Sequence, residues 1–515
     1  PTVKPSPSIP CADSMAPFYS FVWAVSVSFI LVGTIWRGFH PSDVSAYFPA
    51  FHPRPMHHWI NDPNGPMYYN GSYHLFTQYN PDGFVGGPMH WSHLVSKDLL
   101  HWKDLPIALS PDQDYDCGGI FSGSATIIDG TPVLTYSVQC GKVMIHAVPA
   151  PDSDSDLTRW VKPIFNPIMN RPSDTKDFRD PTEGWQGKDG VWRMLTGCNK
   201  GSCMWKSKDF IDWTYTGIFF PTTGFAECPD FFVIPGTDKW VYKGSDGGRD
   251  WYVIGDYIES EGIKTDKYNV TSAPFQQNNQ LYDVGNFYAS KTFYDTPNNR
   301  RVLYGWINYH CDGTDWSGVQ AVPRVVSLDP ITQNTLITYP IPELENLRNP
   351  ATPPQNGSVE IGASFEYSIV TGAQVDVIVR FSKILPGKEY HFGLDIFKDP
   401  STGNGLRVKF DIAADSTASL NGNPFPLYPQ DNQIVSLRLL IDRSVIEAFV
   451  QGGRISETIP YCTPNLANID ILHLGFFNSG TPPITASYEV YSMDRGVPRR
   501  SRQPYITAPV DFPAL

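Results

Sequence analysis

The segments "SKDLLHW" (residues 96–102) and "SKDFIDW" (residues 207–213) share Ser-Lys-Asp, two apolar positions and a closing Trp, and they lie 111 residues apart. Around them, short apolar or alternating runs such as "SYHLFTQY", "PVLTYSV" and "RVLYGWIN" are separated by Gly, Pro, Asn and Asp. This texture predicts short strands joined by turns. A strand–turn–strand unit that recurs favours a propeller over a barrel or a sandwich, although one hairpin type could also occur twice by coincidence.

The spacing of the two copies sets the expected size of the repeat. If 111 residues hold two blades, a blade recurs about every 55 residues and the region 51–345 holds about five. We therefore expect an all-β chain with a five-bladed β-propeller over residues 51–345.

The texture changes beyond about residue 355. Runs such as "VDVIVRFSK", "LRVKFDI" and "IVSLRLLIDRSVIEAFVQGG" alternate strictly between apolar and polar residues, and "DRS" and "GG" stand where hairpins would turn. This pattern predicts a β-sandwich. The Pro- and Asn-rich segment "NLRNPATPPQNGS" (346–358) marks the joint, so we expect a linker and a β-sandwich over residues 346–515.

Length and charge limit the function. A chain of 515 residues is too long for one ordinary core, which agrees with two domains. The net charge of −13 and the pI of about 5.3 argue against nucleic acid as a partner, because a phosphate-binding surface must be basic. Aromatic residues reach 14%, which suits either sugar stacking or a large all-β core.

The N-terminal tail, residues 1–50, contains an uncharged run of 22 residues from Met15 to Trp36. That length spans a bilayer as a helix, and no small-residue cleavage site is evident, so a membrane anchor at about 15–36 is expected. It would be the only contact with a membrane. Three sequons, at Asn70, Asn269 and Asn356, favour glycosylation in the secretory pathway.

The eight cysteines give no sign of a metal centre. No pair has metal-ligand spacing with a second pair, so neither a metal nor an organic cofactor is expected. One or two disulfides are expected in an oxidising lumen, with a pairing that the sequence leaves open.

Three carboxylates stand in unusual settings: Asp62 in "WINDPNG", Asp180 in "FRDPTEGW" and Glu227 in "AECPDFF". Their spacings of 118 and 47 residues are close to multiples of a blade, which would bring them together on a propeller axis. Apolar neighbours would desolvate them and raise a carboxyl pKa, as a general acid requires. Two carboxyl groups of different protonation state are what glycoside hydrolysis needs. The alternative is that Asp-Pro is a common turn dipeptide.

Asp62 lies in a stretch that is rich in aromatic residues. Six aromatic side chains lie within "HHWINDPNGPMYYNGSYHLFTQYNP" (57–81), and Asn61, Pro63, Asn64 and Gly65 predict a turn that carries Asp62. Of the tyrosines, Tyr68, Tyr69 and Tyr73 suit strand packing better than sugar contact.

The ordered set "WINDPNG", "FSGSA" (121–125), "FRDP" and "ECPD" resembles glycoside hydrolase family 32, the β-fructofuranosidases, which include invertases, inulinases and fructan-processing enzymes. "FYASKTFYD" (287–295) and "RRVLYGWIN" (300–308) are similar to plant-type members. The resemblance runs from about Phe51 to the C-terminus, and it implies a propeller, a sandwich and retention of configuration. It also implies roles: Asp62 as nucleophile, Glu227 as acid/base and Asp180 as transition-state stabiliser. The implied fructose-binding residues are Asn61, Trp59, Gln78, Phe121, Ser122 and Arg179.

The segment after "QYNP" departs from the family pattern. Most plant hydrolases of the family carry Trp-Gly-Asn there, whereas this chain has "DGFVGGPMHW" with Gly86 and Pro88 near the usual Trp and Asn. Thr77 replaces a customary Tyr, and "HCDGTDWSGVQ" (310–320) also differs, in a loop expected near the glucose side. Similar changes accompany fructosyltransferases.

We therefore expect a retaining hydrolase of the terminal β-fructosyl bond of sucrose, with fructosyl transfer to sucrose or fructan as the alternative. A non-catalytic sugar-binding propeller is the rival from another class. Pro229 in "ECPD" resembles cell-wall members and an N-terminal anchor resembles vacuolar precursors, so the vacuole lumen and the cell wall both stay open.

Overall fold

The computed structural model describes residues 46–272, 280–362, 366–397, 405–462, 472–480 and 482–497. The expected anchor at 15–36 and most of the tail lie outside these residues. Within the described segments, no helix has both the length and the apolar character needed to cross a membrane.

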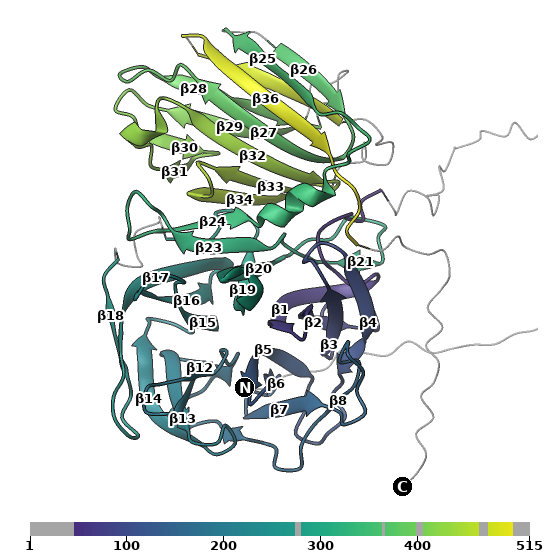
Figure 1. The fold of residues 1–515 in the computed structure, drawn as a ribbon, viewed down its shortest axis with the longest axis vertical. Coiled ribbons are helices and arrows are strands. Elements are labelled where there is room, and N and C mark those ends of the chain that lie inside the picture. Colours follow the sequence, from purple (N-terminus) through teal and green to yellow (C-terminus); the bar gives the residue numbers. More distant parts are fainter. Residues whose placement is uncertain are drawn as a thin grey trace, which may run out of the picture. The chain divides into compact units, whose positions relative to one another are not determined.

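Five sheets are arranged in a ring as the blades of a propeller (Figure 1). Blade 1 consists of β1 (His58–Tyr69), β2 (Ser72–Asn80), β3 (His90–Ser96), β4 (Trp102–Leu109) and the late strand β21 (Trp316–Ser317). Blade 2 consists of β5 (Ile120–Ile128), β6 (Thr131–Val138), β7 (Val143–Pro149), β8 (Trp160–Val161) and β9 (Met169–Asn170). Blade 3 consists of β10 (Phe178–Arg179), β11 (Trp185–Gln186), β12 (Trp192–Cys198), β13 (Gly201–Ser207) and β14 (Trp213–Pro221).

Two further blades complete the ring. Blade 4 consists of β15 (Glu227–Val233), β16 (Trp240–Asp246), β17 (Arg249–Ile258) and β18 (Lys267–Val270). Blade 5 consists of β19 (Tyr288–Asp295), β20 (Arg300–Ile307), β22 (Val319–Gln320), β23 (Arg324–Leu328) and β24 (Leu336–Pro340), with the short helix η1 (Thr296–Asn298) between its first two strands. The strand β21 lies in the chain between β20 and β22 of blade 5, and it pairs in parallel with β1. The connection between these two strands therefore closes the ring onto blade 1.

The repeated Ser-Lys-Asp segments are the same hairpin in two blades. One joins β3 to β4 in blade 1 and the other joins β13 to β14 in blade 3, so the expectation of two blades per 111 residues is confirmed. In both copies the Asp side chain accepts two hydrogen bonds from the backbone of the turn, and the closing Trp donates to a backbone carbonyl three residues earlier. The fourth residue has positive φ in both, 66° at Leu99 and 65° at Phe210.

The first strands of four blades are distorted at their start. The pairing registers of β1, β5, β15 and β19 shift between Ile60 and Pro63, Ile120 and Gly123, Glu227 and Asp230, and Tyr288 and Lys291. Such bulges re-aim side chains and are frequent beside active sites. The prediction of a turn at Asp62 is therefore wrong: the Pro and Gly of "NDPNG" produce two bulges within the continuous strand β1, without ending it.

The second part of the chain forms two six-stranded antiparallel sheets, the predicted β-sandwich (Figure 1). The 3-10 helix η2 (Pro342–Leu347) leads into it. One sheet has the order β25 (Gln355–Ile361), β36 (Ile484–Ser492), β27 (Gln374–Ser382), β32 (Val435–Asp442), β33 (Val445–Val450) and β34 (Ile455–Pro460). The other has β26 (Glu366–Thr371), β35 (Leu472–Asn478), β28 (Tyr390–Ile396), β29 (Leu406–Ile412), β30 (Ala418–Leu420) and β31 (Asn423–Phe425), and η3 (Pro429–Asp431) precedes β32. The expected alternation is clearest in β36, where every second residue is buried over most of the strand.

A buried polar network joins the segment before β1 to the sandwich and to blade 5. Asp442 accepts hydrogen bonds from the backbone of Ala50, Phe51 and His52 at 2.7–3.1 Å. The two ring nitrogens of His52 lie 2.8 Å from Asp442 and 2.9 Å from Glu447. Arg324 binds Glu447 from the other side. His52, Asp442, Glu447 and Arg324 have no solvent exposure.

Three disulfides are present, which corrects the expectation of one or two. They pair Cys117 with Cys140, Cys198 with Cys203, and Cys311 with Cys462. The third joins residues 151 positions apart, so sequence spacing could not reveal it. Cys228 is a buried free thiol.

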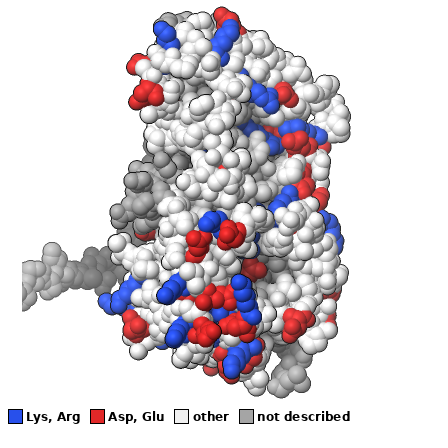
Figure 2. Space-filling view, turned by 60° about the vertical axis from the view of Figure 1, so that its left-hand side comes forward, with Lys and Arg blue, Asp and Glu red and all other residues white. Residues whose placement is uncertain are grey.

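Surface features agree with several sequence-based interpretations. On the face shown in Figure 2, acidic and basic side chains are interspersed. The sequon residues Asn70, Asn269 and Asn356 are all exposed. Tyr73 is buried and its ring lies 5.0 Å from that of Tyr68, so strand packing is confirmed for both.

Candidate active site

A cavity of about 680 Å³ lies where the first strands of all five blades approach one another. It is lined by all nine predicted site residues: Trp59, Asn61, Asp62, Gln78, Phe121, Ser122, Arg179, Asp180 and Glu227. The other lining residues are Gly86, Gly87, Pro88, Met89, Gln139, Cys228, Tyr288 and Trp306. Every one belongs to the propeller, so among the described residues the sandwich contributes nothing to the wall of this cavity.

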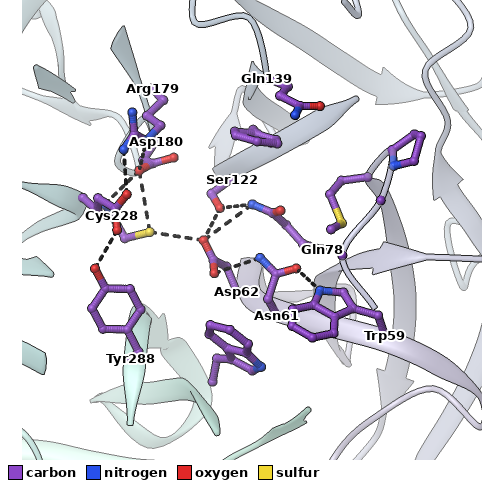
Figure 3. Close-up of a pocket in the computed structure, with 17 residues that line it drawn as sticks. Trp59, Asn61, Asp62, Gln78, Ser122, Gln139, Arg179, Asp180, Cys228 and Tyr288 are labelled. Carbon is purple, nitrogen blue, oxygen red and sulfur yellow. Dashed lines mark hydrogen bonds and ion pairs between the residues drawn. The ribbon is translucent and has the colours of Figure 1, made fainter. Parts of the chain in front are cut away.

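Four donors converge on the carboxylate of Asp62 (Figure 3). Asn61 Nδ2 donates to one oxygen at 3.1 Å. The other oxygen accepts from Ser122 Oγ, from Cys228 Sγ at 3.3 Å and from Gln78 Nε2 at 3.5 Å. Burial raises the pKa of Asp62, and the hydrogen bonds from Ser122, Asn61 and Cys228 act against this rise. The donors therefore favour the ionised carboxylate in a desolvated position.

The neighbours of Asp62 are themselves held in place. Trp59 Nε1 donates to Asn61 Oδ1 at 2.8 Å, which leaves the amide NH₂ of Asn61 for Asp62. The ring of Trp59 meets that of Trp306 edge to face at 5.7 Å. The buried amide of Gln320 donates to the backbone carbonyl of Asn61 at 2.7 Å. These contacts fix the position of β1 where the nucleophile candidate stands.

Both oxygens of Glu227 accept hydrogen bonds. Arg179 Nη2 donates to one at 2.6 Å and Tyr288 Oη to the other at 2.5 Å. Arg179 lies over the ring of Phe225 at 3.8 Å, and its Nε is 3.7 Å from Asp180 Oδ2. One guanidinium thus orients two carboxyl groups. Burial and the neighbouring Glu227 raise the pKa of Tyr288, which keeps its hydroxyl protonated.

Asp180 is almost fully buried, and burial raises its pKa to about 6 while the adjacent Arg179 acts against this rise. Its Oδ2 accepts a hydrogen bond from the backbone N–H of Cys228 at 3.0 Å. Asp180 has φ 60° and Cys228 has φ 43°, the left-handed region that L-residues seldom occupy. Such strain at two adjoining positions is typical of functional sites.

Two buried lysines lie behind these carboxylates. Lys291 Nζ donates to the carbonyls of Pro181 and Pro229 at 3.1 and 3.0 Å. Lys243 Nζ donates to the carbonyl of Cys228 at 3.1 Å and pairs with buried Asp250. The ammonium groups therefore hold the backbone directly after Asp180 and Glu227.

Sequence reasoning missed Tyr288, Trp306, Gln139 and the two lysines as site residues. Tyr288 and Lys291 lie in "FYASKTFYD" and Trp306 in "RRVLYGWIN", segments that the sequence linked to strands and to plant enzymes but not to the site. The useful signal was positional, because "FYASK" begins the first strand of blade 5 as "WINDP" and "ECPD" occur in those of blades 1 and 4.

Gly86 leaves open space at the edge of the cavity. A Cβ there would meet only the end of the Met89 side chain, at 3.8 Å. In the part of the chain that the structure covers, no group of three His, Cys, Asp or Glu side chains is arranged to hold a metal ion.

Comparisons with known proteins agree with this fold and this site. The chain matches the glycosyl hydrolases family 32 N-terminal domain over residues 52–340 and the family 32 C-terminal domain over residues 343–492. It is 34% identical over 524 residues to acid beta-fructofuranosidase 2, vacuolar, of a Rosa hybrid cultivar, covering 86% of this chain and 81% of that one. It is 35% identical over 529 residues to the beta-fructofuranosidase insoluble isoenzyme CWINV6 of Arabidopsis thaliana, covering 86% and 95%.

Among solved structures, fructan 1-exohydrolase IIa from Cichorium intybus is similar, with a TM-score of 0.79, 29% identity, and coverage of 87% of this chain and 98% of that one. Both domain models match in order and together span most of the described residues. The chain therefore belongs to glycosyl hydrolase family 32.

Proposed function

We propose that this glycoside hydrolase is a retaining β-fructofuranosidase that hydrolyses the terminal β-fructosyl bond of sucrose, with Asp62 as nucleophile and Glu227 as acid/base. The observation that carries the proposal is the convergence of Asp62, Asp180 and Glu227, from three blades, on one cavity. Relatives named β-fructofuranosidase support the substrate class.

In the first step, Asp62 attacks C2 of the fructosyl unit while Glu227 gives its proton to the leaving glycosidic oxygen. The bond from C2 to that oxygen breaks, and an ester between Asp62 and C2 forms. The hydrogen bonds to the carboxylate of Asp62 favour its ionised form and align it for attack. Because Ser122, Cys228 and Gln78 all donate to one oxygen, the other, with its single bond to Asn61, is the better placed to attack.

In the second step, Glu227 takes a proton from water as the water attacks C2. The ester bond between C2 and Asp62 breaks, and C2 returns to the configuration that it had in the substrate. The structure has Glu227 with both oxygens accepting hydrogen bonds, which is the arrangement of the base. Asp180 lies beside both partners, where a carboxylate stabilises the positive charge that develops on the sugar ring and binds its hydroxyl groups.

Fructosyl transfer is the second candidate, because the wall expected near residue 86 is absent. Transfer differs only in the second step, where a sugar hydroxyl replaces water. Open space alone does not orient an acceptor, so hydrolysis stays first.

Replacement of Asp62 by Asn, or of Glu227 by Gln, should lower the rate of glucose release from sucrose roughly 10³-fold or more, with the fold unchanged by circular dichroism. Exposed Asp114 lies outside the cavity, so Asp114→Asn is the matched control and should keep the full rate.

An Asp62→Asn variant that keeps more than about a tenth of the wild-type rate would refute the assignment. The same assay separates the two acceptors. Equal amounts of glucose and fructose mean hydrolysis, and a persistent fructose deficit with trisaccharide formation means transfer. No glucose release by the wild type would favour the non-catalytic binding propeller.

We also infer that the protein works in the vacuole lumen or at the cell wall. Three disulfides suit an oxidising secretory compartment, and the three sequon residues are exposed for glycan attachment. The relatives include both vacuolar and insoluble enzymes, so either end point is compatible.

A further inference from the structure

The two segments that depart from the family pattern meet at one aromatic stack. Phe84, from "DGFVGGPMHW", lies against His310, from "HCDGTDWSGVQ", with ring centroids 4.9 Å apart and an interplanar angle of 7°. Neither ring lines the cavity, but Phe84 is two residues from Gly86, which does, so their Cα atoms are at most about 7 Å apart.

The stack of Phe84 and His310 is exposed to solvent, whereas an aromatic pair in a packed core would be buried. The side chain of Phe84 is 44% exposed, that of the adjacent Val85 is 60% exposed, and His310 is also exposed. Because His310 covers one face of the Phe84 ring, the exposed area is offered by its other face and edge. A single exposed apolar residue needs no explanation. A flat, exposed aromatic pair beside the opening of a sugar-cleaving cavity is a ready stacking surface.

Both sides of the stack are held rigidly. On the Phe84 side, the backbone N–H of Trp59 donates to Gly83 O at 2.9 Å and Asn80 Nδ2 donates to Val85 O at 2.8 Å. On the His310 side, ring Nδ1 donates to the carbonyl of Trp316 at 2.9 Å, and the next residue is bonded to the sandwich through the Cys311–Cys462 disulfide. A preformed surface binds without a further cost of ordering.

We propose that Phe84 and His310 form a binding platform for a sugar ring that lies outside the cavity, beyond the ring bonded directly to the cleaved fructosyl unit. The proposal rests on the proposed function and deepens it, since it names oligosaccharides of three or more rings as favoured substrates. Inside the cavity, Asp62 binds the fructosyl ring, and the edge formed by Gly86 and Met89 faces the second ring. The third ring then reaches the exposed face of Phe84.

The platform has no part in bond cleavage, so it is a positioning element and its mark is selectivity. Stacking against an aromatic ring contributes on the order of two- to tenfold in affinity. This gain applies to a trisaccharide and not to sucrose, whose two rings are held within the cavity.

The test measures binding and turnover separately. On the Asp62→Asn background, titration calorimetry should give a tighter Kd for 1-kestose, a trisaccharide of one glucosyl and two fructosyl units, than for sucrose. Phe84→Ala added to that background should reduce the ratio of the two affinities roughly two- to tenfold. Phe84→Tyr should restore most of it. In the active enzyme, Phe84→Ala and His310→Ala should lower the ratio of kcat/KM for 1-kestose over sucrose by a similar factor.

Phe165→Ala is the matched control, because Phe165 is 42% exposed and lies outside the cavity lining. It should change neither ratio. Unchanged ratios in folded Phe84→Ala, or equal losses for both sugars, would overturn the platform. Failure of the wild type to cleave either sugar would instead refute the proposed function, and the binding ratios would still decide on the platform.

Discussion

Asp62 and Asp180 both carry a carboxyl group, but their surroundings differ and so do their proposed roles, nucleophile for Asp62 and stabiliser of the transition state for Asp180. Hydrogen bonds to Asp62 oppose the desolvation of its charge, whereas Asp180 is almost fully buried and its pKa reaches about 6. Because an Asp side chain in the unfolded chain has a pKa of about 3.8, Asp180 loses its proton at a lower pH in the unfolded chain than in the folded protein. Its raised pKa therefore contributes stability that is fully present below about pH 4 and is lost as the pH rises through about 6.

An Asp180→Asn variant should remove this loss. Relative to the wild type, its free energy of unfolding should rise between pH 4 and pH 7 by up to about 3 kcal/mol, while activity falls. Urea unfolding at both pH values measures the difference. Asp114→Asn, at an exposed position, should show no such change, and the same pH dependence in Asp180→Asn and the wild type would contradict the argument.

At the scale of elements, the segment before β1 depends on one buried histidine. Burial acts to lower the pKa of His52, but hydrogen bonds to Asp442 and Glu447 raise it to about 9. Arg324 and Asp283 complete the charged surroundings, since Arg324 pairs with both Glu447 and Asp283. A raised pKa in the folded state means that the imidazolium contributes stability that is fully present below about pH 6.5 and lost as the pH rises through about 9.

We expect His52→Gln to lower the free energy of unfolding by roughly 3–5 kcal/mol at pH 6, because it leaves two buried carboxylates short of a cation. The wild type should lose about 3 kcal/mol between pH 6 and pH 9 through this group, and the variant should not. Urea unfolding across that range is the measurement. His101→Gln, which removes an exposed His–Asp pair, should follow the wild type, and parallel curves for all three proteins would count against the network.

The strands also explain what the sequence could reveal. Asp62, Asp180 and Glu227 could be predicted because each lies in a short motif near the start of a blade, where the structure has a bulge or a left-handed residue. Phe121, Ser122 and Arg179 were predicted only through the resemblance of their motifs to the family. The turn predicted at Asp62 was wrong because Pro and Gly signal a bulge as readily as a turn. Tyr288 and Lys291 could not be predicted from the sequence, because their partners lie in other blades and come close only in the closed ring.

At the scale of the whole molecule, the disulfides differ in what they constrain. Cys311–Cys462 joins the loop between β20 and β21 to the sandwich across 151 positions, whereas Cys198–Cys203 spans 5 within one hairpin. No sequence motif could have predicted the pairing of Cys311 with Cys462, because only the packing of the sandwich on the propeller brings them together.

The double variant Cys311→Ser/Cys462→Ser should lose about 5 kcal/mol of stability by the chain-entropy estimate, against about 2 kcal/mol for Cys198→Ser/Cys203→Ser. Denaturant midpoints of the two variants test the order. The first variant should also weaken trisaccharide binding, because His310 adjoins Cys311 and would be held less firmly without the disulfide. A larger loss from the short loop would show that strain, and not loop closure, dominates.

The hydrogen bond between His52 and Asp442 has a consequence for folding during synthesis on the ribosome. The two residues are 390 positions apart, so at ~5–20 residues per second the imidazole is made about 20–80 s before its carboxylate partner. For about the first two thirds of that interval, blade 1 also lacks β21, the strand that closes the ring. The nascent catalytic half must therefore wait with an open sheet edge and an unmatched buried segment, which makes this protein a natural client for chaperones in the compartment where it is synthesised.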